Sequence, residues 1–228
     1  MIIGILAGEP SGDRLGAGLM RALKARRAES GDGVIRFVGI GGPLMLAEGL
    51  ECLVPMERLA VNGFAEPVKR LPDLIRILRT LLDVYRRQPP DAFIGVDFNV
   101  FNFLIERLLK RRGFGTVHYV SPSVYAWRRG RVRRIGRSTD LLLTLYPFEP
   151  AFYTDSPVEA VFVGHPLADE IDPEMSDAAH RTRAREQLGL VGEGPVVAVL
   201  PGSRASEVKL MGPGFLEACE HIRTAEPS

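Results

Sequence analysis

The sequence predicts an α/β fold: a Rossmann-like, doubly wound parallel sheet with helices on both faces. Two patterns along the chain point to it, because short apolar or β-branched runs recur and longer segments of helical periodicity separate them. Strands that alternate with helices in this way form right-handed βαβ units. The composition agrees, since 46% hydrophobic and 25% charged residues in a chain of 228 exclude disorder, collagen and coiled coil.

Each expected element rests on a local pattern. The expected strands are residues 2–6, 35–40, 92–96, 116–120, 141–145, 160–163 and 196–200. Apolar residues repeat on one helical face at 15–23, 71–82 and 101–109. In such sheets ligands bind beyond the carboxyl ends of the strands, so the loops after residues 6, 40, 96, 120 and 163 are where a site is expected.

The chain is expected to hold one whole domain and the beginning of another. Residues 1–168 contain most of the predicted strands and form the first domain. Residues 169–195 are interpreted as a linker, because they carry Pro173, many charges and a glycine-rich turn. Residues 196–228 are expected to begin a second α/β unit, since one strand and about two helices cannot close a core of their own.

Composition also narrows the classes of function. Lys and Arg number 29 against 28 Asp and Glu, a formal net charge of +1, so no nucleic-acid partner is expected. The two cysteines and four histidines lack the spacing of a metal site, and we expect no metal, cofactor or disulfide framework. The N-terminus lacks a signal-peptide pattern, and no apolar run reaches the roughly 20 residues of a membrane-spanning helix. A cytoplasmic protein is therefore expected.

The first predicted strand runs into a glycine-rich turn at residues 7–18. This turn matches neither the dinucleotide fingerprint, nor the phosphate-binding loop of nucleoside triphosphatases, nor the serine elbow of hydrolases. It still places the first amides of a helix at the ligand edge of the sheet. Glu9, Ser11 and Asp13 are therefore candidate substrate-binding residues. For Ser11 and Asp13 the alternative is a helix N-cap.

Asp97 directly follows the expected strand 92–96. A carboxylate at the end of a buried strand lowers the stability of the fold unless it is hydrogen-bonded, so its presence there indicates a hydrogen bond or a role in the reaction. Asp97 is therefore the best general-base candidate in the chain. The alternative is that it caps the next helix, which is expected to begin near Asn99. His165 follows another expected strand in the same way, and it is either a ligand-binding residue or a structural hydrogen bonder.

Two segments are candidate contacts for phosphate or for an anionic lipid surface. Six arginines occur within residues 128–137 without an acid between them. Residues 61–87 combine an apolar helical face with basic residues, the pattern of an interfacial helix. The expected membrane or phosphate patch includes Phe64, Lys69, Arg70, Arg131 and Arg134. The alternatives are a solvated helix face for the first segment and a helix packed on the sheet for the second.

The last expected strand ends in a Gly-Ser turn that is followed by an arginine. Backbone amides, a hydroxyl and a guanidinium at Gly202, Ser203 and Arg204 would together form a clamp for a pyrophosphate. An ordinary strand-to-helix turn with an exposed arginine is the alternative.

Six segments, taken in order, resemble the lipid-A-disaccharide synthase family: AGEPSGD at 7–13, FVGIGGPLM at 37–45, GVDFNVFN at 95–102, HYVSPSVYAWR at 118–128, GHP at 164–166 and LPGSRASEV at 200–208. The resemblance implies a GT-B glycosyltransferase with two Rossmann-like halves and the active site between them. It implies an inverting transfer from UDP-2,3-diacylglucosamine to 2,3-diacylglucosamine 1-phosphate, also called lipid X. The products would be the β-1,6-linked lipid A disaccharide 1-phosphate and UDP.

The resemblance also implies roles for particular residues. Asp97 matches the family's base and Arg204 its arginine on the phosphate side, while Glu9 and the following Ser-Gly-Asp match the motif of the N-terminal crevice. Further residues of the matching segments are expected to bind substrate: Ser121, Trp127 and Arg128. The implied protein is peripheral on the cytoplasmic side of the inner membrane, and its partners are the two lipid substrates and the anionic membrane surface.

Two departures from the family pattern affect the interpretation. Val100 stands where the family commonly has a second aspartate, which leaves Asp97 as the carboxylate of that loop. The C-terminal half, which holds most of the UDP pocket in the family, is expected to be present only as its beginning. We therefore weigh a synthase that needs self-association or a complementing C-terminal half against a truncated, inactive acceptor- or membrane-binding module. A third hypothesis, a different nucleotide-binding Rossmann enzyme, conflicts with the failed nucleotide-binding templates.

Overall fold

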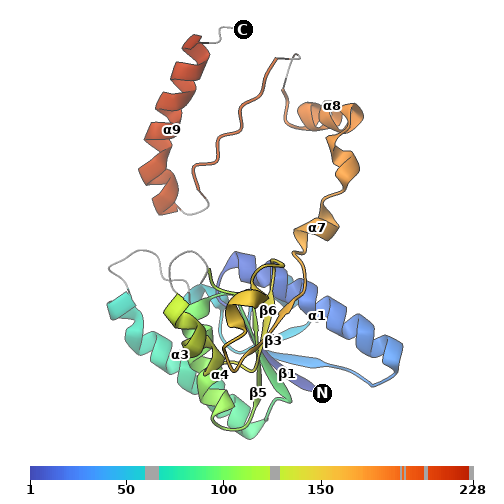
Figure 1. Ribbon diagram of the computed structural model, residues 1–228, viewed down its shortest axis with the longest axis vertical. Helices are drawn as coiled ribbons and strands as arrows, with labels where there is room; N and C mark the ends of the chain where they lie inside the picture. The colour runs from blue at the N-terminus through green and yellow to red at the C-terminus, as the bar shows by residue number, and fades with distance from the viewer. Residues whose placement is uncertain (60–66, 124–128, 191, 193, 203–204, 226–228) are drawn as a thin grey trace. The chain divides into compact units, whose positions relative to one another are not determined.

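The computed structural model describes residues 1–59, 67–123, 129–190, 192, 194–202 and 205–225 (Figure 1). The chain divides into two compact units, Met1–Glu170 and Ile171–Ser228, and each is described by itself. Across the described residues, no helix has both the length and the apolar character that crossing a membrane requires.

The first unit is built on a sheet of seven strands in which every neighbouring pair is parallel. The strand order is β3-β2-β1-β4-β5-β6-β7, so the chain winds from β1 to one edge and then from β4 to the other. The strands are β1 (Ile2–Ala7), β2 (Arg36–Ile40), β3 (Leu50–Cys52), β4 (Ala92–Val96), β5 (Gly115–Tyr119), β6 (Leu141–Thr144) and β7 (Glu159–Phe162). The predicted doubly wound α/β fold is confirmed, and the prediction missed the three-residue β3.

Helices cover both faces of this sheet. They include α1 (Pro10–Ser30), α2 (Pro43–Ala47), α3 (Pro67–Arg87), α4 (Asn99–Lys110) and α6 (Val132–Gly136). The short helix α7 (Leu167–Glu170) follows β7, and none of its side chains is buried. Short 3₁₀ turns are η1 (Met56–Arg58), η2 (Arg129–Arg131) and η3 (Pro150–Tyr153). The three helical faces that the sequence predicts lie within α1, α3 and α4.

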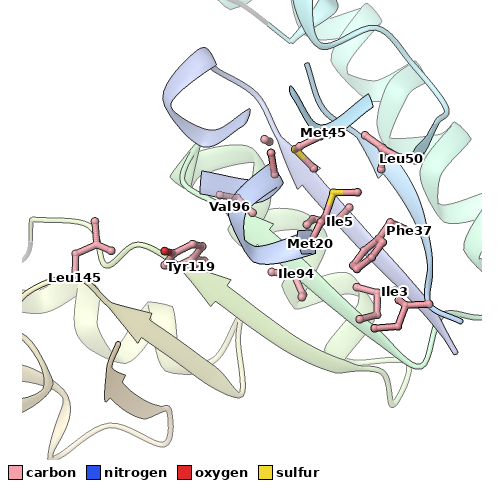
Figure 2. Packing of buried hydrophobic residues seen from close by; sticks show 13 residues of the cluster. Ile3, Ile5, Met20, Phe37, Met45, Leu50, Ile94, Val96, Tyr119 and Leu145 are labelled. Atoms are coloured by element: carbon pink, nitrogen blue, oxygen red, sulfur yellow. The ribbon is translucent and has the colours of Figure 1, made fainter. Parts of the chain in front are cut away.

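Successive side chains of a strand point to opposite faces of a sheet, so each central strand contributes to two cores. On one face, Ile5 of β1 belongs to a cluster with Met20 of α1 and Met45 of α2 (Figure 2). On the other face, the adjacent Leu6 belongs to a cluster with Leu81 of α3 and with apolar residues of α4. The α1–α2 pair and the α3–α4 pair therefore lie on opposite faces of the sheet.

The second unit contains η4 (Pro173–Ser176), α8 (Ala178–Gln187) and α9 (Ala205–Ala225). Both η4 and α8 lie in the segment that the sequence predicts as a linker. The strand predicted at 196–200 is wrong, because the structure has no strand there and Val197 and Leu200 are exposed. A strand needs a partner for its backbone groups, and the described part of this unit offers none. None of the side chains described in this unit is buried.

Candidate functional site

The turn after β4 carries Asp97 and Phe98 in left-handed conformations. Their φ angles are 49° and 46°, which are uncommon values outside glycine and mark a strained backbone. The Asp97 N–H donates to the Tyr119 carbonyl at 2.8 Å, and the side-chain amide of Asn102 donates to the Asp97 carbonyl at 2.8 Å. Asn102 also donates to one carbonyl of β1 and one of β4, both at 3.3 Å. These hydrogen bonds tie the strained turn to three neighbouring strands.

The Asp97 carboxylate is half-buried and accepts a hydrogen bond from the Ser11 hydroxyl, with 3.3 Å between Oγ and Oδ2. Ser11 lies in the first turn of α1, so two predicted site residues from distant parts of the chain meet here. The capping alternative for Asp97 is wrong, because the N-cap of α4 is Phe98. A carboxylate at this edge that does not cap a helix can take part in proton transfer.

Asp13 has a structural role, contrary to the sequence prediction. Its side chain is 3% exposed, and its two oxygens accept hydrogen bonds of 2.9–3.0 Å from three amides, those of Gly42, Leu44 and Met45. These amides belong to the beginning of α2, so Asp13 supplies the cap that this helix lacks locally. The capping alternative for α1 is also wrong, because its N-cap is the half-buried Glu9 and both Ser11 and Asp13 follow inside the helix.

A groove of about 780 Å³ opens beside α1, at the carboxyl ends of β5, β6 and β7. Ser11, Arg14 and His165 lie along it, and an ion pair joins Arg14 to Glu170 at its side. His165 accepts a hydrogen bond at Nδ1 from the Leu167 amide at 3.2 Å. His165 therefore makes a structural hydrogen bond, as the alternative interpretation predicted. It also lines the groove that contains Ser11.

A smaller pocket of about 240 Å³ lies between α4 and residues 131–138. Its lining combines apolar and basic side chains, among them Val100, Phe103, Leu104, Arg107, Arg131 and Arg134. An apolar wall with guanidinium groups suits a ligand that has both an alkyl chain and an anionic group. The two described arginines of the predicted phosphate patch, Arg131 and Arg134, thus come together at a concave site.

Arg107 also lines this pocket and was not predicted from the sequence. A signal for it was present, because Val100, Leu104 and Arg107 recur at the spacing of one helix face. This face is distinct from the buried stripe of Phe101, Ile105 and Leu109, and Val100 is 88% exposed.

Ser121, a predicted substrate-binding residue, is turned into the protein interior. Its hydroxyl lies 2.8 Å from the Tyr153 hydroxyl and donates to the Pro122 carbonyl at 3.1 Å. Burial raises the pKa of Tyr153 to about 12, so the phenol stays protonated at neutral pH and can donate to Ser121. These two hydrogen bonds fix the Ser121 side chain in the interior, where its role is structural.

Several predicted residues lie outside the described residues: Phe64, Trp127, Arg128, Ser203 and Arg204. Lys69 and Arg70 belong to α3, but their side chains also lie outside the described part. Gly202 lies in the second unit with a φ of 131°, a conformation that strains any residue with a side chain. In the described ranges, no three His, Cys, Asp or Glu side chains are grouped as a metal site.

Comparison with known proteins yields consistent matches. The model of a family described as Lipid-A-disaccharide synthetase matches residues 3–228. A lipid-A-disaccharide synthase of Pseudomonas putida (strain GB-1) is 51% identical over 222 residues, which is 97% of this chain and 56% of the relative. One of Alkalilimnicola ehrlichii is 52% identical over 229 residues, 100% of this chain and 58% of the relative. One of Burkholderia mallei (strain ATCC 23344) is 47% identical over 225 residues, 99% of this chain and 56% of the relative.

The chain therefore spans little more than half the length of the curated relatives that it matches. Among solved structures, the crystal structure of CalG4, the calicheamicin glycosyltransferase, is 15% identical to it with a TM-score of 0.33. That similarity covers 82% of this chain and 40% of the other.

Proposed function

The chain belongs to the lipid-A-disaccharide synthetase family, and from this membership we propose that it forms the acceptor-side part of a GT-B glycosyltransferase. The proposed reaction joins UDP-2,3-diacylglucosamine to 2,3-diacylglucosamine 1-phosphate and releases UDP. The observation that carries the proposal is the Ser11–Asp97 hydrogen bond. It joins the first turn of α1, which follows β1, to the turn after β4. The winding of the sheet reverses between β1 and β4, and ligands of doubly wound folds bind at such a point.

In the proposed mechanism Asp97 is the general base. It accepts the proton of the acceptor's 6-hydroxyl while that oxygen forms a bond to the anomeric carbon of the donor sugar. The bond from this carbon to the UDP oxygen breaks, and UDP leaves with the electron pair, so the configuration at the carbon inverts. The strained turn and the Ser11 hydroxyl support this role because they hold the carboxylate in one place.

The acceptor lipid is proposed to bind in the pocket between α4 and α6. Its phosphate would pair with Arg107, Arg131 and Arg134, since guanidinium groups bind phosphate oxygens with two parallel hydrogen bonds. An acyl chain would pack against Val100 and Leu104, which the fold leaves exposed. One ligand would thus account for the mixture of apolar and basic side chains.

The donor diphosphate is proposed to bind at Gly202, Ser203 and Arg204. In the first unit, Glu9 and His165 are proposed as substrate-binding residues. Backbone amides at the start of α9 and a guanidinium are suited to a diphosphate. The rest of the UDP pocket is proposed to lie in the part of the relatives that has no counterpart in this chain. A complementing C-terminal half or a second copy would then be a partner of the chain.

The protein is proposed to be peripheral on the cytoplasmic side of the inner membrane. Support comes from the beginning of α3, where Leu71 and Ile75 are 54% and 39% exposed, one turn apart. Exposed Arg76 and Arg79 follow, and such a combination binds anionic headgroups. Phe64, Lys69 and Arg70 are proposed to extend this contact. Membrane contact suits an enzyme whose two substrates carry acyl chains.

Disaccharide formation from the two purified lipids tests the proposal. The 228-residue chain alone should form little product, whereas the chain joined to the C-terminal part of the Pseudomonas putida relative should form it readily. In the joined protein, Asp97→Asn should lower kcat at least about 100-fold, because an amide cannot accept the proton. The control Asp32→Asn, at an exposed loop position, should stay within about twofold. Robust product from the chain alone, or unchanged turnover of Asp97→Asn, would contradict the proposal.

A further inference from the structure

Two ionisable side chains, one from α4 and one from β5, are fully buried next to each other. Glu106 of α4 and His118 of β5 are both 0% exposed, with 2.6 Å between Oε1 and Nδ1. A Cβ at residue 95 would lie 2.2 Å from Glu106 Oε1, so the close approach requires Gly95. The Phe103 ring stacks on the His118 ring with 4.1 Å between centroids. Burying such a pair is seldom favourable for stability alone, and the proposed proton transfer does not use it.

From the 2.6 Å distance and the full burial of both side chains we infer that one hydrogen lies between Oε1 and Nδ1 and that the pair carries no net negative charge. Burial raises the pKa of Glu106, and a net negative charge in this enclosed place would be strongly destabilised. Either Glu106 is protonated and donates to Nδ1, or His118 is protonated and donates to Glu106 through Nδ1. In both arrangements the other ring nitrogen, Nε2, carries a hydrogen. Glu106 Oε2 has no hydrogen-bond partner among the described residues, which favours the uncharged arrangement.

The hydrogen on Nε2 determines the orientation of a third side chain. His118 Nε2 lies 3.2 Å from Oδ1 of Asn99, the first residue of α4. Because Nε2 donates to this oxygen, the NH₂ group of the Asn99 amide faces away from His118. Asn99 is half-buried and lines the same pocket as Arg107, Arg131 and Arg134.

We propose that Asn99 binds the acceptor by donating its amide NH₂ to a phosphate oxygen, and that Glu106 and His118 are positioning residues that hold the amide in this orientation. The inference rests on the proposed acceptor site. Guanidinium groups supply positive charge, and the oriented amide adds one hydrogen bond of fixed direction. An aspartate at this position would have the same shape but would repel the phosphate.

Binding of short-chain 2,3-diacylglucosamine 1-phosphate to the 228-residue chain tests the assignment, with the same lipid lacking phosphate as a second probe. Asn99→Asp keeps the oxygen that accepts from His118 but replaces the donor with a negative oxygen. It should weaken binding of the phosphorylated lipid at least about tenfold and change that of the other lipid less than about twofold. Gln88→Glu adds the same charge at an exposed position and should change neither. An equal loss for both lipids, or no difference between the two variants, would overturn the assignment.

The positioning role needs a separate measurement. In the unaltered chain, ¹⁵N NMR should show a hydrogen on His118 Nε2 near neutral pH, and an unprotonated Nε2 would overturn the role without any variant. Replacing the pair by Glu106→Met and His118→Phe removes both polar groups at similar volume. This variant should bind the phosphorylated lipid several-fold more weakly, and adding Asn99→Ala should cause no further loss, because the pair acts through Asn99. Fully additive losses would also overturn the role.

Failure of this inference and failure of the proposed function give different results. If the unaltered chain binds neither lipid, the proposed acceptor site is refuted, and the phosphate role of Asn99 is refuted with it. If the chain binds the phosphorylated lipid while Asn99→Asp behaves like Gln88→Glu, only the role of Asn99 is refuted.

Discussion

At the scale of single residues, Asp13 and Asp97 show how neighbours decide the role of a carboxylate. Both follow central strands of the sheet at its carboxyl edge. Asp13 is almost fully enclosed and accepts hydrogen bonds from three backbone amides, and these hydrogen bonds stabilise the fold. Asp97 is half-buried and accepts from the Ser11 hydroxyl, a donor that can rotate. Only the second arrangement leaves a carboxylate suited to exchange a proton with a ligand.

We expect Asp13→Ala to lower the free energy of unfolding by about 3 kcal/mol, because three amides at the beginning of α2 lose their acceptor. Urea-induced unfolding at neutral pH measures this change. Asp32→Ala, at an exposed loop position, is the control and should stay within about 0.5 kcal/mol of the unaltered chain. Equal stability of the two variants would show that Asp13 does not cap α2.

At the scale of an element, the apolar stripe of α3 is buried along its later turns and exposed near its beginning. Ile77, Leu81 and Tyr85 are buried on the sheet, and the Tyr85 hydroxyl donates to a carbonyl of β2 at 2.9 Å. Leu71 and Ile75, nearer the beginning, are exposed. The alternative of a helix packed on the sheet is therefore correct for the later turns of α3. The earlier turns keep an apolar stripe that the first unit leaves exposed.

This division of α3 predicts the effect of changing the exposed stripe. Leu71→Ser combined with Ile75→Ser should weaken binding to phosphatidylglycerol vesicles at least about tenfold, because it removes apolar area that would enter the headgroup region. Vesicle co-sedimentation measures the affinity, and urea unfolding should show little change in stability. The control is Val34→Ser, which alters an exposed valine outside α3. Wild-type affinity in the double variant would place any membrane contact elsewhere.

At the scale of the whole molecule, the two units differ in what stabilises them. Met1–Glu170 has apolar clusters on both faces of its sheet and a further cluster beside β6 and β7. In Ile171–Ser228, none of the described side chains is buried. Since burial of apolar surface is the main favourable term in folding, the first unit carries the stability of the described chain.

The first unit should accordingly fold when residues 171–228 are removed. We expect residues 1–170 to unfold cooperatively, with a free energy of unfolding within about 1 kcal/mol of that of the 228-residue chain. Circular dichroism during urea unfolding of both chains measures the difference. A loss of cooperative unfolding in the shorter chain would contradict this independence and the predicted domain boundary near residue 168.

Six of the seven strands and the three longest helices of the first unit were predicted, because buried positions show as apolar residues in the sequence, whereas β3 and the short helices α2, α6 and α7 were missed. Buried parallel strands appear as apolar runs, and α1, α3 and α4 repeat their apolar residues with a helical period. The three residues of β3 are too few to show a period. The strand expected at 196–200 shows the opposite error, since an apolar run indicates that a strand can form but pairing requires a partner.

The sequence by itself determined the fold class, the family resemblance and Asp97 as the candidate base, because each depends on the order of residues along the chain. Tertiary structure alone decided which polar groups share a site. It brought Ser11 to Asp97, enclosed Asp13 against α2, and assembled the arginines of two segments around one pocket. The physical reason is that hydrogen bonds and burial depend on distances between segments, and the packing of helices on the sheet sets those distances.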